Sequence, residues 1–123
     1  EIDTRQREIY NLVLEAQEAG IRAVAPGKTG QEIDAAAREI IEKAGYAENF
    51  GHGLGHGVGL QIHEEYPRLS KSGQTALKEG MVFSVEPGVY IPGWGGVRIE
   101  DLVSVTPGGV EVLTSAPKEL LVL

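Results

Sequence analysis

Hydrophobic residues near the start of the chain recur at the spacing of a helix that buries one face. Between residues 5 and 24 they are Ile9, Leu12, Val13, Ala16 and Ala19. Glutamates occupy other positions of the same stretch, which gives it a polar face. Pro26 and Gly27 end the pattern, because proline and glycine both interrupt helices. We therefore predict a first helix over residues 5–24.

A second amphipathic segment follows, with recognisable signals at both ends. Thr29, followed three residues later by Glu32, resembles a capping box, and Gly45 stands where a helix-terminating glycine belongs. The residues expected to face the core are Ile33, Ala37, Ile40, Ile41 and Ala44. We predict a second helix from about residue 30 to residue 44.

After Tyr46 the helical spacing stops, and glycine, valine and alternation take over. This pattern predicts strands near 54–62, 81–90, 97–105 and 110–114, and the polar stretch 64–80 is predicted to be a loop. Two helices followed by antiparallel strands indicate an α+β fold. With 123 residues and no linker or repeat, we expect residues 1–123 to form a single domain with a modest core.

Composition excludes several classes of protein. No apolar run approaches a membrane span, and we expect no signal peptide. The lack of cysteine removes disulfides, thiolate metal sites and cysteine nucleophiles, and it fits a cytoplasmic location. A net charge of −7 without a basic cluster argues against a nucleic-acid partner.

All three histidines, His52, His56 and His63, fall within a span of twelve residues. Glycine fills every odd position from 51 to 59, so an extended chain would have one face of bare backbone that a ligand or strand could approach closely. The first two histidines share the other face, whereas His63 has the opposite parity and reaches them only through a bend near Gly59. Three unrelated histidines are the simpler alternative, but clustering on a glycine lattice favours a site.

Two predicted strands carry carboxylates, Glu86 and Glu100, and residues 92–96 between them have turn composition. A hairpin centred on Gly93 would place the two glutamates opposite each other, unless bulges shift the register. Facing carboxylates repel, so a shared proton, an arginine such as Arg98 or a cation should offset the repulsion. A bridging metal is the strongest of these, and the alternative is an exposed glutamate beside an ordinary ion pair.

Histidine and carboxylates without thiolates suit manganese, cobalt, iron or zinc. Two bridging carboxylates suit a two-metal site, in which ions about 3.5–4 Å apart clamp a hydroxide. Such a hydroxide attacks a carbonyl or phosphoryl centre. Because the chain has no phosphate-cradling loop, the residues favour amide hydrolysis.

These motifs resemble those of the pita-bread metallopeptidases: His-Gly-Leu-Gly-His-Gly-Val-Gly-Leu-Gln-Ile-His at 52–63, Val-Glu-Pro-Gly at 85–88 and Gly-Val-Arg-Ile-Glu-Asp at 96–101. The family includes Xaa-Pro dipeptidases (prolidases), Xaa-Pro aminopeptidases and methionine aminopeptidases, and the resemblance runs from about Gln6 onward. His52, the stretch 89–98 and the ending at 113–120 favour the proline-directed branch. The resemblance implies a partial pita-bread fold, in which two helices precede a curved antiparallel sheet.

The resemblance also implies a metal-binding role for three residues. His56, Glu86 and Glu100 look like ligands of the metal ions, with Glu100 bridging them. Glu86 would in addition act as general base or proton shuttle for the attacking water. Manganese or cobalt is the first choice of metal, and zinc or iron the second.

Other residues would act on the substrate, a peptide with proline at its second position. By the same resemblance His63 hydrogen-bonds the substrate and helps stabilise the tetrahedral intermediate. His52 lines the pocket near the proline side and counts among the catalytic residues. Arg98 contacts the substrate or buttresses the glutamates.

The family pattern also includes two aspartate ligands that this chain does not match. Asp3-Thr4-Arg5 mimics the motif Asp-x-Thr-Arg-Thr but lacks the intervening residue, so Asp3 is predicted to be a helix N-cap. We expect the chain to be the C-terminal portion of a catalytic domain without those aspartates, and inactive by itself. It should bind one divalent ion weakly and a second hardly at all, and an unpaired sheet edge should invite self-association.

The leading hypothesis is therefore metal-dependent hydrolysis of Xaa-Pro bonds by the parent enzyme. One alternative is a methionine aminopeptidase fragment, which differs in substrate but not in chemistry. Another is a non-catalytic module on the same fold that binds peptides or proteins, which the joint retention of His56, Glu86 and Glu100 argues against. The sequence leaves open the choice between dipeptidase and aminopeptidase.

Overall fold

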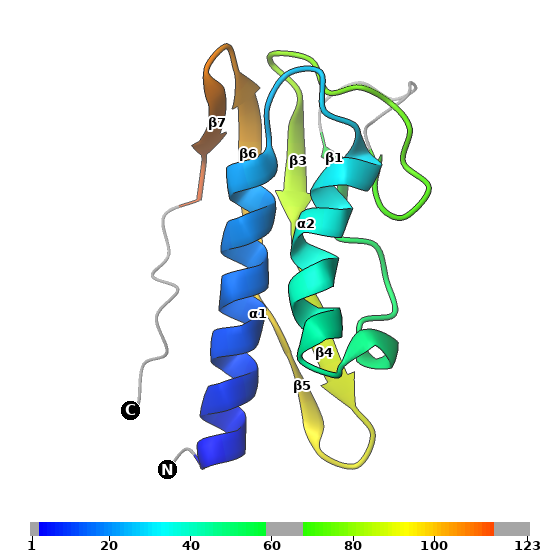
Figure 1. Ribbon diagram of the computed structural model, residues 1–123. Coiled ribbons are helices and arrows are strands. Elements are labelled where there is room, and N and C mark those ends of the chain that lie inside the picture. Colours follow the sequence, from blue (N-terminus) through cyan, green and yellow to red (C-terminus); the bar gives the residue numbers. More distant parts are fainter. Residues whose placement is uncertain (1–2, 59–67, 115–123) are drawn as a thin grey trace.

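In the computed structural model, which describes residues 3–58 and 68–114, two helices lie side by side against one face of an antiparallel sheet (Figure 1). Helix α1 spans Thr4–Ala23 and helix α2 spans Gly30–Lys43, each within two residues of the predicted bounds. Both helices begin with a capping box, built on Asp3 in α1 and on Thr29 in α2. The N-cap roles predicted for these two residues are confirmed.

The rest of the described chain is mostly short strands, which confirms the α+β fold. A 3-10 helix, η1, at Ala47–Asn49 precedes them. The strands are β1 (Gly55–Val58), β2 (Arg68–Leu69), β3 (Val82–Val85), β4 (Gly88–Ile91), β5 (Gly95–Arg98), β6 (Asp101–Thr106) and β7 (Gly109–Val112). Five of them form one sheet in the order β2-β1-β3-β6-β7, and β4 and β5 form a separate hairpin that extends beyond one end of the sheet (Figure 1).

The strands predicted over 81–90 and 97–105 are each divided in two. One break falls at Glu86 and Pro87, where proline lacks the N–H that a ladder requires. The ladders on either side nevertheless keep one register, since Val85 pairs with Asp101 and Gly88 pairs with Arg98. This is the register of a hairpin centred on Gly93, as predicted, and it opposes Glu86 and Glu100 between the two ladders.

Two sequence predictions were wrong in detail. The stretch predicted to be a loop contains the two-residue strand β2, because Leu69 pairs with Gly55. Ala44, expected in the core, is exposed, because α2 already ends at Lys43. The helix-terminating glycine is nonetheless where it was predicted, because Gly45 follows the C-cap residue Ala44 and has a φ of 93°.

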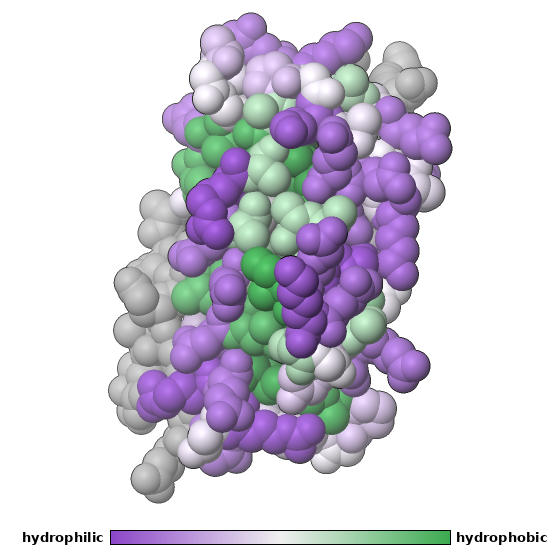
Figure 2. All heavy atoms as spheres, in the orientation of Figure 1, coloured by the Kyte–Doolittle hydropathy of each residue, from purple (hydrophilic) through white to green (hydrophobic). Residues whose placement is uncertain are grey.

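The core lies between the helices and the sheet. Its largest fully buried hydrophobic side chains are Ile9, Ile33, Ile41, Leu54, Leu69, Leu77 and Phe83. On the helical face, hydrophilic side chains flank a band of hydrophobic ones (Figure 2). None of the described helices is both long and apolar enough to cross a membrane.

Candidate metal and substrate site

Glu86 lies at the break between β3 and β4, where its backbone leaves the sheet ladder. Its N–H donates to the carbonyl of Leu54 at 2.7 Å, and its side chain is 14% exposed. The carboxylate is therefore held at the edge of the core with one side open to solvent. A carboxylate in this setting can accept a proton or bind a cation.

His56 on β1 meets that carboxylate. Its Nε2 lies 3.3 Å from Oε2 of Glu86, and its side chain is 65% exposed. The preceding residue makes this approach possible, because a Cβ on Gly55 would lie 1.8 Å from the carbonyl oxygen of Ser84. The predicted use of glycine for close approach between backbones is confirmed at this position.

Ser84 on β3 links the two residues, and the sequence analysis did not identify it. Its buried hydroxyl donates to Oε2 of Glu86 at 2.7 Å and accepts from the backbone N–H of His56 at 3.1 Å. The available signal was a polar residue in an otherwise apolar strand, two positions before Glu86 and so on the same face. One hydroxyl thus fixes the separation of two proposed ligands.

Arg98 and Glu100 come from the opposite strand of the hairpin. Nη1 of Arg98 lies 3.9 Å from Oε1 of Glu86, which is the arginine compensation that facing glutamates should require. Glu100 is exposed and stands opposite Glu86 in the register. Within residues 3–58 and 68–114, no group of three His, Cys, Asp or Glu side chains is arranged to hold a metal ion. Convergence of Glu100 with His56 and Glu86 on one ion stays a prediction.

His52 lies against Tyr90, an aromatic residue of β4. Its Nε2 lies 3.0 Å from the hydroxyl of Tyr90, and its ring packs edge-on against Phe50 with centroids 5.1 Å apart. Tyr90 is 39% exposed, so this pair borders solvent. His63, the third predicted histidine, lies outside the described residues.

The neighbour of Glu100 has a different environment. Asp101 is buried, accepts from Nε2 of Gln17 on α1 at 2.8 Å, and also accepts from the hydroxyl of Thr114. The bond from Gln17 anchors the start of β6 to the first helix, and the bond from Thr114 ties it to the residues after β7. No role was predicted for these three residues from the sequence, because nothing local in it joins positions so far apart.

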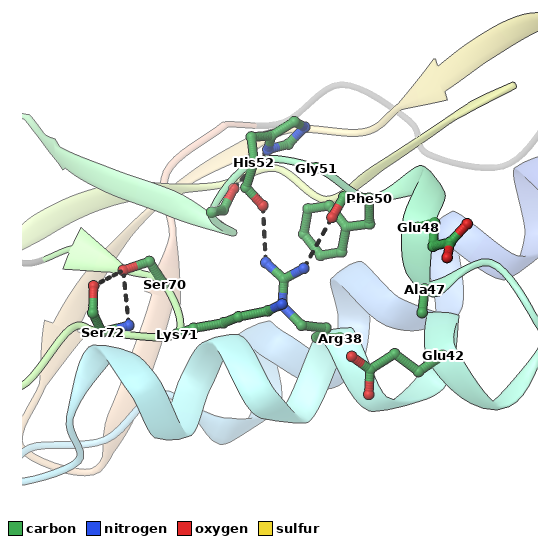
Figure 3. A pocket seen from close by; sticks show the side chains of 11 residues that line it. Arg38, Glu42, Ala47, Glu48, Phe50, Gly51, His52, Ser70, Lys71 and Ser72 are labelled. Carbon is green, nitrogen blue, oxygen red and sulfur yellow. Dashed lines mark hydrogen bonds between the residues drawn. The ribbon is translucent and has the colours of Figure 1, made fainter. Parts of the chain in front are cut away.

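A hollow of about 630 Å³ lies between α2 and the segment 50–53. Figure 3 shows the side chains that line it. Among the predicted site residues that the structure describes, His52 alone lines it, so the hollow is not where His56 and Glu86 meet. The contact between His56 and Glu86 lies where β1 meets the end of β3, outside this hollow.

The donor set fits a divalent metal ion in kind. Imidazole nitrogen and carboxylate oxygens suit manganese, cobalt, iron or zinc, and second partners of ligands, such as the Ser84 hydroxyl on Glu86, are typical of metal sites. His56 and Glu86 present such donors at 3.3 Å from each other.

Comparisons with known proteins agree with this description. The model of Metallopeptidase family M24 matches residues 1–107. An Xaa-Pro dipeptidase of Pyrococcus furiosus is 56% identical over 95% of this chain and 33% of its own length. The solved Xaa-Pro dipeptidase of Bacillus anthracis has a TM-score of 0.94 at 53% identity, over all of this chain and 34% of its own. An X-Pro aminopeptidase of Thermotoga maritima has a TM-score of 0.89 at 44% identity, over 96% of this chain and 33% of its own.

The fold and the sequence are those of a metallopeptidase, and His56 and Glu86 meet within that fold at 3.3 Å. The chain belongs to metallopeptidase family M24. It spans about a third of the length of the relatives it matches.

Proposed function

We propose that the protein to which this chain belongs hydrolyses peptides with proline at the second position, using two divalent metal ions. The observation that carries the proposal is the contact between His56 and Glu86, fixed by Ser84, in a chain 56% identical to an Xaa-Pro dipeptidase. In this proposal the chain is the C-terminal portion of the catalytic domain, and other parts of the protein complete the ligand set. A cytoplasmic location stays a prediction.

His56, Glu86 and Glu100 would hold the metal ions, with Glu100 as the bridging ligand. Bound metal would polarise the scissile carbonyl and supply a hydroxide at neutral pH. Manganese or cobalt is the first choice, and zinc or iron the second. The carboxylate of Glu86 would take the proton of the attacking water and pass it to the leaving nitrogen.

The remaining predicted residues would act on the substrate. Arg98 lies beside Glu86 and is 53% exposed, so its guanidinium can contact a substrate carboxylate or buttress the glutamate. His52 and Tyr90 form an edge that is aromatic and partly open, which suits packing against a proline ring. His63 would hydrogen-bond the substrate carbonyl and stabilise the tetrahedral intermediate.

The test is an assay of the full-length protein, freed of metal and reloaded with manganese, cobalt, zinc or iron in parallel. Substrates should be an Xaa-Pro dipeptide, the matching Xaa-Ala dipeptide and an Xaa-Pro tripeptide. We expect metal-dependent cleavage that prefers proline, and the tripeptide separates dipeptidase from aminopeptidase activity. Equal cleavage of Xaa-Ala would contradict the proline preference, and no cleavage under any metal would favour a binding module.

A further inference from the structure

A buried ion pair on α2 lies behind the segment that carries His52 and His56. Nε of Arg38 donates to Oδ2 of Asp34 at 2.8 Å, and Nη2 donates to Oδ1 at 3.1 Å. Arg38 is 7% exposed and Asp34 is 1% exposed. Burying two charges is unfavourable unless their remaining hydrogen-bonding capacity is satisfied, so the other partners of the pair show what it holds.

Arg38 uses its remaining donors on the backbone of the histidine segment. Nη1 donates to the carbonyl of Phe50 at 3.0 Å, and Nη2 donates to the carbonyl of His52 at 2.8 Å (Figure 3). The guanidinium also stacks on the ring of Phe50, 4.1 Å from its centroid. A planar group with five N–H donors can serve all these acceptors at once, whereas an ammonium cannot.

Asp34 continues the connection toward the metal site. Its Oδ1 accepts from the N–H of Leu54 at 3.1 Å, and the carbonyl of Leu54 accepts from the N–H of Glu86 at 2.7 Å. Leu54 is fully buried and lies two residues before His56. A single residue, Leu54, therefore joins Asp34 on the helix to the backbone of Glu86, and the strand that carries His56 begins at the next residue.

We infer that Arg38 and Asp34 are positioning residues for the metal site, acting through the backbone of residues 50–54 on His52, His56 and Glu86. This inference rests on the proposed function for its catalytic consequence, but not for the structural coupling itself. The pair is hydrogen-bonded to the backbone of Phe50, His52 and Leu54. This backbone carries His52, leads into His56 and accepts the N–H of Glu86. A pair that served only general stability would leave the metal site unchanged in molecules that remain folded.

The experiment compares three variants of the full-length protein: Arg38→Met, Arg38→Lys and Val13→Ala. Val13 is a buried core residue of α1, so its truncation lowers stability without touching the pair. All proteins are measured at a temperature where each is folded. The readouts are amide hydrogen exchange of peptides covering 50–56 and 82–88 without metal, manganese affinity by calorimetry, and kcat and KM for an Xaa-Pro dipeptide.

We expect Arg38→Met to speed exchange in both peptides, because the backbone of residues 50–54 loses its support. Manganese affinity and kcat should fall about tenfold, the lower end of what loss of a direct partner of a metal ligand costs, since Arg38 acts through that backbone. Val13→Ala should leave manganese affinity and kcat unchanged, and any faster exchange should spread over the whole core rather than concentrate in these two peptides. Arg38→Lys keeps the charge beside Asp34, so it should be more stable than Arg38→Met. Its manganese affinity should stay low, because an ammonium cannot reach Asp34 and the carbonyls of Phe50 and His52 at once. This variant also provides the test if Arg38→Met does not fold.

The inference is overturned if Arg38→Lys, or folded Arg38→Met, matches Val13→Ala in exchange and manganese affinity. Failure of the proposed function would appear differently, as a wild-type protein that does not cleave Xaa-Pro peptides. In that case the exchange and manganese measurements still decide whether the pair positions the site.

Discussion

Two arginine–carboxylate pairs of the described residues differ in their surroundings: Arg38 and Asp34 meet in the interior, and Arg98 and Glu86 meet near the surface. The inner pair meets at 2.8 Å with side chains 9% and 2% exposed, and the outer pair lies 3.9 Å apart with side chains 53% and 14% exposed. The outer distance exceeds that of a normal hydrogen bond. The same two chemical groups are thus closely bonded in one region and only loosely associated in the other.

The difference concerns how much hydrogen-bonding capacity each carboxylate retains. Asp34 accepts from Nε and Nη2 of Arg38 and from the backbone amide of Leu54. Glu86 accepts a short bond from Ser84 and has a looser neighbour in His56 at 3.3 Å. A carboxylate has about four lone-pair sites, so Glu86 keeps acceptors for a cation or a proton. We call Arg38–Asp34 the closed pair and Arg98–Glu86 the open pair. The closed pair holds the backbone, and the carboxylate of the open pair can still bind a cation or a proton.

The strongest way to break this comparison is to neutralise the open carboxylate. Glu86→Gln keeps the shape of the side chain but removes its charge and its basicity. We expect kcat of the full-length protein to fall by about 10² to 10⁴-fold, the contribution of general acid–base catalysis, or further if metal binding is also lost. Thermal unfolding should change little. A variant that keeps wild-type turnover would show that Glu86 is not the reactive group.

For the buried pair, Arg38 and Asp34, the main effect is expected on stability. Asp34→Ala leaves the charge of Arg38 buried without its partner, which should lower the free energy of unfolding by about 3–5 kcal/mol. Denaturant unfolding of the full-length protein measures the loss. The matched change in the same helix is Asp34→Asn, which keeps the acceptor for Leu54 and should cost less. If both variants unfold like wild type, the inner pair contributes no stability.

The sequence predicts the helices and the register of the hairpin because both depend on local signals. Spacing, caps and a glycine-centred turn lie within a few residues of each other, as at Thr29 and Gly93. The signal for the break, Pro87, is also local. It was missed because the hydrophobic pattern that predicts a strand over 81–90 continues on both sides of the proline. The sequence analysis therefore predicted one long strand where proline ends one and begins another.

The predicted site was recognisable for the same reason, since His52, His56, Glu86 and Arg98 stand in short motifs. The residues that hold it were missed because they act across the fold. Asp34 looks like an ordinary polar helix residue until α2 packs against residues 50–54. Nothing near Ser84 in the sequence indicates that β1 will supply an amide to its hydroxyl.

A smaller effect should follow from removing the hydroxyl that joins the open site. Ser84→Ala deletes one bond to Glu86 and leaves the amide of His56 without its partner. We expect a loss of about 1–3 kcal/mol in unfolding free energy. Manganese affinity should fall by about tenfold. The control is Ser104→Ala. Ser104 lies on β6, which is the neighbour of β3, and pairs there with Val82, so the control removes the same hydroxyl from an adjacent strand. Equal manganese affinity in the two variants would remove Ser84 from the site.

The smallest effect on stability is expected for Arg98, the arginine of the open pair. Arg98→Met removes the charge beside Glu86 but retains most of the length of the side chain. Because the pair is exposed and 3.9 Å apart, its loss should change the unfolding free energy by about 0–1 kcal/mol. If Arg98 contacts the substrate, KM for an Xaa-Pro dipeptide should rise while kcat changes less, since a contact made equally before and during the reaction affects binding alone. Arg38→Met, measured alongside, should instead lower kcat and stability. An Arg98→Met variant that loses stability as Arg38→Met does, with KM unchanged, would mean that the two pairs serve the same purpose.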